Sequence, residues 1–169
     1  MSQFSLDTGI SNSKSTLQIT RHMPHIQPKF WKEKALNQLN HAEWEALCDG
    51  CAKCCLHRLE DEETREIHFT NVVCRLLDLE TAQCTRYTER SVLVPNCITM
   101  TLKDLDDPYW LPSTCAYRLL AEGKELPEWH PLCSGDPDSV FNSGNAILGR
   151  VVCETEADDL EYHMIDWIT

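Results

Sequence analysis

The chain has 169 residues, of which 42% are hydrophobic and 25% charged, and this length suits one compact domain with a modest core. Fifteen Lys and Arg against twenty-seven Asp and Glu give a formal net charge of -12, so the chain repels phosphate backbones and nucleic acid is not expected as a partner. The sequence contains no apolar run of about 18 residues and no secretory signal at its polar start, so we expect no membrane span and a cytoplasmic location.

Three parts are expected along the chain. Residues 1–28 are rich in Ser, Thr, Gln and Asn, which predicts a flexible N-terminal tail. Residues 29–133 carry the dense group of cysteines and are expected to form a metal-binding domain. Residues 134–169 form an acidic segment that we expect to pack on that domain.

Two helices are predicted from their end signals. Asn40 and Glu43 are placed like an N-cap residue and its partner three positions into a helix, which would cover about 42–48. A second helix over 114–122 is preceded by a serine and followed by a glycine. Cys115 would lie in its first turn, where unpaired N–H groups favour a thiolate.

Extended segments are predicted from β-branched and aromatic residues. Residues 59–65 form a charged loop, 67–73 read as a strand that 75–79 continue, and 91–94 and 147–152 read as further extended pieces. The expected fold class is therefore α+β: a small irregular metal-stabilised domain with short helices and short antiparallel strands.

An apolar stripe marks the acidic C-terminal segment. Leu160, Met164 and Trp167 follow an i, i+4, i+7 pattern, which is typical of a helix that docks on its own core. The less favoured interpretation is a helix that binds a protein partner, either through this stripe or through the acidic surface.

Eight of the ten cysteines fall within one stretch of the chain. Thiols are scarce in intracellular proteins, and so many together indicate commitment to a metal, a disulfide or a redox cycle. In a reducing compartment metal ligation is favoured over disulfides, and two four-thiolate sites would use all of the eight. The remaining two, Cys133 and Cys153, are interpreted as ordinary cysteines. The candidate ligands are Cys48, Cys51, Cys54, Cys55, Cys74, Cys84, Cys97 and Cys115.

The ligand number does not separate zinc from an iron–sulfur cluster, because both take four thiolates. Structural zinc is usually held by two close pairs, whereas this chain has one compact Cys-x2-Cys-x2-Cys group followed by single cysteines. That spacing is closer to the iron–sulfur pattern, although the proline that usually follows the remote cysteine is absent. The sequence therefore favours iron–sulfur, with zinc as the alternative.

Cys54 and Cys55 are adjacent, and neighbouring side chains in extended backbone project in opposite directions. One hypothesis is that they serve two sites, with Cys48, Cys51 and Cys54 in one centre and Cys55 in another. The alternatives are a buried structural cysteine or a vicinal redox pair.

No catalytic motif accompanies the cysteines. The sequence contains no nucleophile with a spaced base, no glycine-rich phosphate loop and no His-Glu-x2-His pattern. We therefore assign no catalytic residue, and enzyme activity is less favoured than its absence.

The residues also resemble a known family. The resemblance rests on segments 47–56 (LCDGCAKCCL), 73–78 (VCRLLD), 94–97 (VPNC), 110–120 and 129–137. They are similar to the YcgN family of bacterial cysteine-cluster proteins, part of a wider CxxCxxCC group described as zinc- or iron-chelating. The resemblance implies the same eight cysteines as ligands, without a reaction and without a pairing of the eight into sites.

Three functions are weighed. The first is a small cytoplasmic metal-cluster protein that binds iron–sulfur or zinc and acts in electron transfer, metal handling or partner docking. The second is a redox or metal-assisted enzyme that uses an open metal position or the Cys54-Cys55 pair as a dithiol. The third is a purely structural zinc interaction module.

Overall fold

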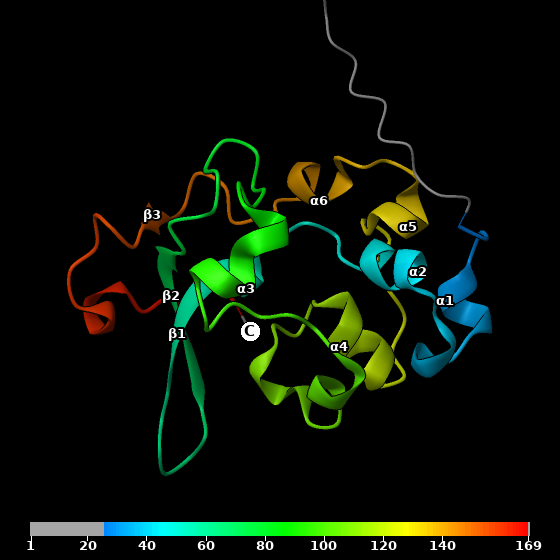
Figure 1. The fold of residues 1–169 in the computed structure, drawn as a ribbon, viewed down its shortest axis with the longest axis horizontal. Coiled ribbons are helices and arrows are strands. Elements are labelled where there is room, and N and C mark those ends of the chain that lie inside the picture. Colours follow the sequence, from blue (N-terminus) through cyan, green and yellow to red (C-terminus); the bar gives the residue numbers. More distant parts are fainter. Residues whose placement is uncertain (1–25, 169) are drawn as a thin grey trace, which may run out of the picture.

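The computed structural model describes residues 26–168 and has short helices around a small three-stranded sheet (Figure 1). The α+β class expected from the sequence is confirmed. The expected tail, 1–28, falls almost wholly outside the described residues, and the division into three parts stays a prediction. The helices are α1 (Phe30–Glu33), α2 (His41–Ala46), α3 (Arg90–Leu93), α4 (Ala116–Ala121), α5 (Pro131–Ser134) and α6 (Ser139–Asn142), and the strands are β1 (Leu56–Glu60), β2 (Ile67–Val73) and β3 (Val152–Cys153).

The sheet has the order β1-β2-β3 and is mixed. β1 and β2 form an antiparallel hairpin, with Leu56 opposite Val73 and Glu60 opposite Ile67. β3 pairs with β2 in parallel, which differs from the antiparallel strands that we expected. Two parallel neighbouring strands need a long connection. Here the chain between β2 and β3 contains the four helices α3 to α6.

Local signals placed some elements correctly. β2 covers the predicted 67–73, and α2 begins after Asn40, whose side-chain Oδ1 accepts a hydrogen bond from Glu43 N at 3.0 Å. α4 is shorter than predicted, with Cys115 as its N-cap residue rather than in its first turn.

Other elements differ from the sequence predictions. Residues 75–79 turn back instead of continuing β2, and within them Leu77 forms a single antiparallel bridge with Cys84. Residues 90–93 are helix α3 rather than strand. Of the C-terminal stripe, only Leu160 lies on a 3-10 turn, η6 (Leu160–His163), and the described residues 160–168 contain no longer helix. Met164 and Trp167 follow the turn, and Met164 forms a single antiparallel bridge with Thr70.

The buried apolar side chains form two clusters. The sheet-side cluster comes from β1, β2 and the segments that follow them: Ala52, Leu56, Phe69, Val73, Leu77, Ala82, Ile147 and Ile168. The helix-side cluster comes from α1, α2, α4 and their connections: Phe30, Leu47, Leu105, Leu111, Ala116, Tyr117 and Leu126. Figure 1 shows the sheet and these helices on opposite sides of the molecule, with α3 between them.

Candidate metal centre

All eight predicted cysteines line one cavity of about 620 Å³. The cavity lies between the two apolar clusters, because its walls include Leu56 and Leu77 of the sheet-side cluster and Leu47 and Leu111 of the helix-side cluster. The sequence predicted which cysteines belong together, and the fold gathers them from segments far apart in the chain. Cys133 and Cys153 do not line the cavity, in keeping with their interpretation as ordinary cysteines.

The first three cysteines lie on the loop between α2 and β1. Asp49 Oδ1 accepts a hydrogen bond from Cys51 N at 3.0 Å, which closes a tight turn at Gly50, whose φ of 78° lies in the left-handed region. Ala52 also has a left-handed φ of 61° and begins the 3-10 turn η2 (Lys53–Cys55). This loop wraps around the cavity, as expected from the spacing of its thiols.

The single cysteines are carried to the cavity by backbone pairing. Cys74 N donates a hydrogen bond to Cys55 O at 3.0 Å, which continues the β1–β2 ladder by one residue. The turn after Cys74 returns through the Leu77–Cys84 bridge. Arg75 then reaches Leu93 O at 2.9 Å and ties α3, just ahead of Cys97, to the end of the sheet.

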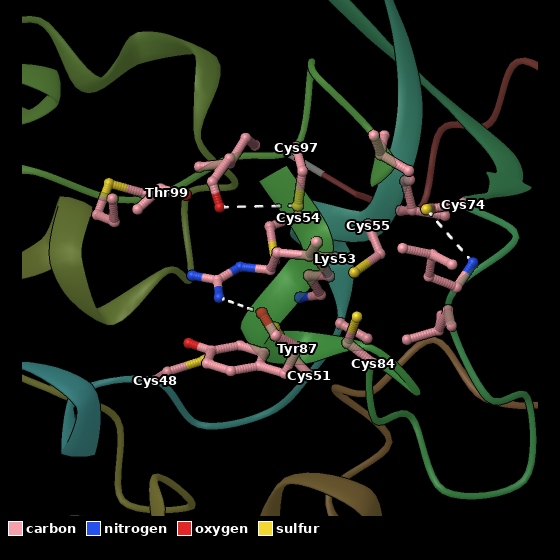
Figure 2. Close-up of a pocket in the computed structure, with 18 of the residues that line it drawn as sticks. Cys48, Cys51, Lys53, Cys54, Cys55, Cys74, Cys84, Tyr87, Cys97 and Thr99 are labelled. Carbon is pink, nitrogen blue, oxygen red and sulfur yellow. Dashed lines mark hydrogen bonds between the residues drawn. The ribbon is translucent and has the colours of Figure 1, made fainter. Parts of the chain in front are cut away.

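The thiols surround a volume and do not converge on a point. Figure 2 shows Cys55, Cys74 and Cys84 on one side of the cavity, Cys48 and Cys51 beside Tyr87 on another, and Cys54 and Cys97 between them. Within residues 26–168, no three Cys, His, Asp or Glu side chains lie close enough together to share a metal ion. Cys48 and Cys54 are accessible to a water molecule although protein surrounds them, because they face the cavity.

The environment of Cys48, Cys51 and Cys115 favours the protonated thiol in the absence of a metal. Burial raises the pKa of Cys48 to about 12 and that of Cys115 to about 11. Burial also raises the pKa of Cys51 far above its usual value, and the neighbouring Asp49 carboxylate adds to the effect. A thiolate must form before a metal binds, so a metal entering this cavity would displace protons.

Sequence reasoning missed several charged residues at the site. Lys53 is only 7% exposed, and its Nζ donates a hydrogen bond to Thr114 Oγ1 at 2.8 Å. Asp49 Oδ2 is buried without a hydrogen-bond partner in the described part of the chain. The position of Lys53 between two cysteines of the compact group was the one signal that could have drawn attention to it.

A buried histidine also contacts the backbone next to the first cysteine of the cavity. His130 is fully buried, its Nε2 lies 3.0 Å from Leu47 O, and its Nδ1 accepts a hydrogen bond from Leu132 N. The second contact fixes the proton on Nε2, so the neutral ring donates to the carbonyl of Leu47, which precedes the first cysteine. Sequence analysis gave His130 no role.

No described helix is long and apolar enough to cross a membrane.

The donor set and the cavity thus agree with what is known of similar sequences. Residues 47–116 match a family model with the description "Putative zinc- or iron-chelating domain" for the CxxCxxCC motif. No solved structure matches the chain. Metal binding in general is supported at this level, while the choice of metal and the narrower YcgN name stay predictions.

Full-length relatives extend the match. A UPF0260 protein of Rhizorhabdus wittichii is 57% identical over 137 residues, which cover 81% of this chain and 94% of the relative. UPF0260 proteins of Parvibaculum lavamentivorans and Cellvibrio japonicus are 52% and 50% identical and are covered over 96% and 98% of their lengths, with 86% and 84% of this chain aligned. With thiols gathered around one cavity and similarity along nearly the whole of these relatives, the chain belongs to the UPF0260 family.

Proposed function

We propose that this protein is a cytoplasmic iron–sulfur protein whose eight cavity cysteines hold the clusters, and that it acts in electron transfer or metal handling. The observation that carries the proposal is the gathering of eight thiols, from the loop before β1, the turn after β2, the segment after α3 and the start of α4, around one cavity. Such a donor set suits thiolate-seeking metals, and an oxygen-seeking cation such as magnesium would find few ligands there.

The spread of the thiols supports iron–sulfur over zinc. A single zinc ion needs four sulfurs at about 2.3 Å from one point, so its ligands crowd together. In an iron–sulfur cluster each thiolate binds a different iron, so the ligands stand around a larger body. The eight thiols of this cavity line a volume of about 620 Å³, which offers room for a body larger than a single ion.

The charges in the cavity wall support an anionic occupant. A metal centre with four thiolates is negatively charged, for either zinc or a cluster. Lys53, Arg58 and Arg90 line the cavity together with the carboxylates of Glu45, Asp49 and Glu154, and none of these three cations forms a salt bridge within residues 26–168. Lys53 is buried, and a buried cation without a carboxylate partner is expected where another anion balances it.

When bound, a cluster would supply one-electron transfer, and the protein would supply the binding and the electrostatics. Backbone N–H groups contribute as well, since Leu76 N lies 3.5 Å from Cys74 Sγ (Figure 2). Hydrogen bonds to the sulfur and nearby cations stabilise added negative charge and so set the reduction potential.

Anaerobic purification with elemental analysis and a visible spectrum tests the proposal. We expect brown protein with stoichiometric iron and inorganic sulfide, and a marked decrease of the colour and of the bound iron in Cys51→Ser. Cys133→Ser is the matched control, because Cys133 is exposed and outside the cavity, and it should keep the wild-type spectrum. Colourless protein with stoichiometric zinc would contradict the iron–sulfur assignment in favour of a structural zinc module, and metal-free folded protein would contradict both.

A second candidate function is a dithiol redox activity of Cys54 and Cys55. The observation that favours it is their interaction: the Cys55 side chain is the main cause of the raised pKa of Cys54. Oxidation would join the two sulfurs in a disulfide and release two electrons and two protons to an acceptor. If both thiols are metal ligands, neither will react with iodoacetamide in the native protein, whereas rapid labelling of both would favour the dithiol.

A further inference from the structure

We propose that the eight thiols form two separate four-thiolate centres, a helix-side centre of Cys48, Cys51, Cys54 and Cys115 and a sheet-side centre of Cys55, Cys74, Cys84 and Cys97. The inference rests on the proposed metal-binding function and adds to it the number of centres and the ligands of each.

The sheet-side centre follows from backbone pairing at one end of the sheet. Cys55 and Cys74 are joined by the hydrogen bond from Cys74 N to Cys55 O. Cys84 returns to the same place, because it bridges Leu77 and because Thr85 N donates to Leu76 O at 2.8 Å. These three thiols therefore belong to one small unit of structure, on the same side of the cavity in Figure 2.

Cys97 joins this unit through α3. Arg75, next to Cys74, binds Leu93 O at the end of α3, and Cys97 N then donates to Val94 O at 2.8 Å in the turn that follows. Cys97 is thus tied by backbone contacts to the segment that carries Cys74.

The helix-side centre is tied together by Lys53. Its hydrogen bond to Thr114 joins two segments 61 positions apart in sequence, and the neighbours of these two residues are Cys54 and Cys115. Cys48 and Cys51 lie on the same loop as Cys54, within the turn closed by Asp49. The loop of three thiols and the start of α4 therefore face each other across a buried lysine.

The two centres contact different apolar clusters. Cys55 packs against the sheet-side cluster and Cys115 against the helix-side cluster. Adjacent Cys54 and Cys55 would then join the centres through one peptide unit, which places the centres next to each other. Neighbouring clusters at such short range suit electron exchange between them.

Metal counting in single and double variants tests the partition. Cys115→Ser and Cys84→Ser should each lose about half of the wild-type iron, and the combination should lose nearly all. Cys54→Ser with Cys115→Ser should lose no more than either alone, whereas Cys54→Ser with Cys84→Ser should lose nearly all. Complete loss of iron in each single variant would overturn the two-centre proposal. The ligand assignment would be overturned if Cys54→Ser with Cys115→Ser lost nearly all of the iron and Cys54→Ser with Cys84→Ser lost only about half. A wild-type protein without metal would instead refute the proposed function.

A second measurement avoids substitutions that prevent folding. Wild-type protein is treated with increasing amounts of a chelator and iodoacetamide, and the labelled cysteines are identified by mass spectrometry. Two groups of four should be released, each as a unit and with the membership given above. Release of all eight in a single step, or of mixed groups, would overturn the proposal.

Discussion

Lys53 places a positive charge in the wall of the cavity, between Cys51 and Cys54 in sequence. Its side chain is nearly fully buried, and a hydroxyl group is its hydrogen-bond partner within the described chain. If the cavity holds a cluster, as proposed, a cation in its wall would stabilise the reduced form, which carries one more negative charge. Lys53 would then help to set the reduction potential.

Lys53→Met should lower the reduction potential of the helix-side cluster by on the order of 50 mV, because a nearby positive charge is removed. A potentiometric titration followed by visible absorption measures the shift. Lys103→Met, on an exposed side chain, is the matched control and should leave the potential unchanged. Equal potentials in the wild type and Lys53→Met would show that the ammonium does not act on the cluster.

His130 predicts how stability depends on pH. Burial holds the pKa of His130 below its usual 6.5, since protonation would place a second ring N–H against Leu132 N. The unfolded chain therefore binds a proton as the pH falls below about 6.5 while the folded chain does not, and stability decreases in that range.

His130→Gln should be less stable than wild type near neutral pH, where the buried ring makes both of its hydrogen bonds. The difference in melting temperature should narrow below pH 6.5, because the variant lacks the group that the unfolded wild type protonates. Melting curves of both proteins over the same pH series measure this, and acid release of metal affects both alike. If the difference in melting temperature did not change with pH, either His130 would gain no proton in the unfolded chain or it would titrate at the same pH in the folded and unfolded chains.

At the scale of the elements, the sequence predicted helices and strands correctly where interactions between neighbouring residues determine them. The capping box of Asn40 and Glu43 predicted α2, and the β-branched residues of 67–73 predicted β2. Residues 91–94 were predicted as extended, and they form α3 instead. There the ties from Arg75 to Leu93 O and from Arg90 to the Tyr87 carbonyl and ring hold the segment in a turn, and no local pattern reveals such contacts.

The cap of α2 gives a stability prediction for an element. Asn40→Ala removes the acceptor for Glu43 N and should lower the free energy of unfolding by about 1 kcal/mol. Asn37→Ala is the matched control, because Asn37 is exposed and its side chain makes no hydrogen bond among the described residues. Chemical denaturation of the loaded proteins gives both values. Equal losses in the two variants would assign the effect to general helix propensity.

At the scale of the whole molecule, the sequence named the cysteines that line the cavity but not their arrangement. The density of cysteines and the family resemblance named the eight that line the cavity. Their proposed division into two centres depends on hydrogen bonds between residues far apart in sequence, such as Lys53 to Thr114 and Cys74 to Cys55. No local sequence pattern predicts such contacts. The buried charges escaped notice for the same reason, since burial is a property of the assembled fold.

Metal removal should abolish cooperative unfolding. The two apolar clusters are small and contact the cavity from opposite sides, so the chain has no single core large enough to replace the metal contacts. Treatment with a chelator under reducing conditions should therefore broaden or eliminate the thermal transition seen by circular dichroism. An unchanged melting curve after complete metal removal would show that the fold is independent of the metal.

The position of the cavity between two small cores has a consequence for the life of the protein in a cell. A newly made chain that has not received its inorganic cargo would be an open substrate for quality-control proteases. The steady-state amount of this protein would then follow the supply of metal and sulfide, even at a constant rate of synthesis, and its abundance would report on the nutritional state of the bacterium.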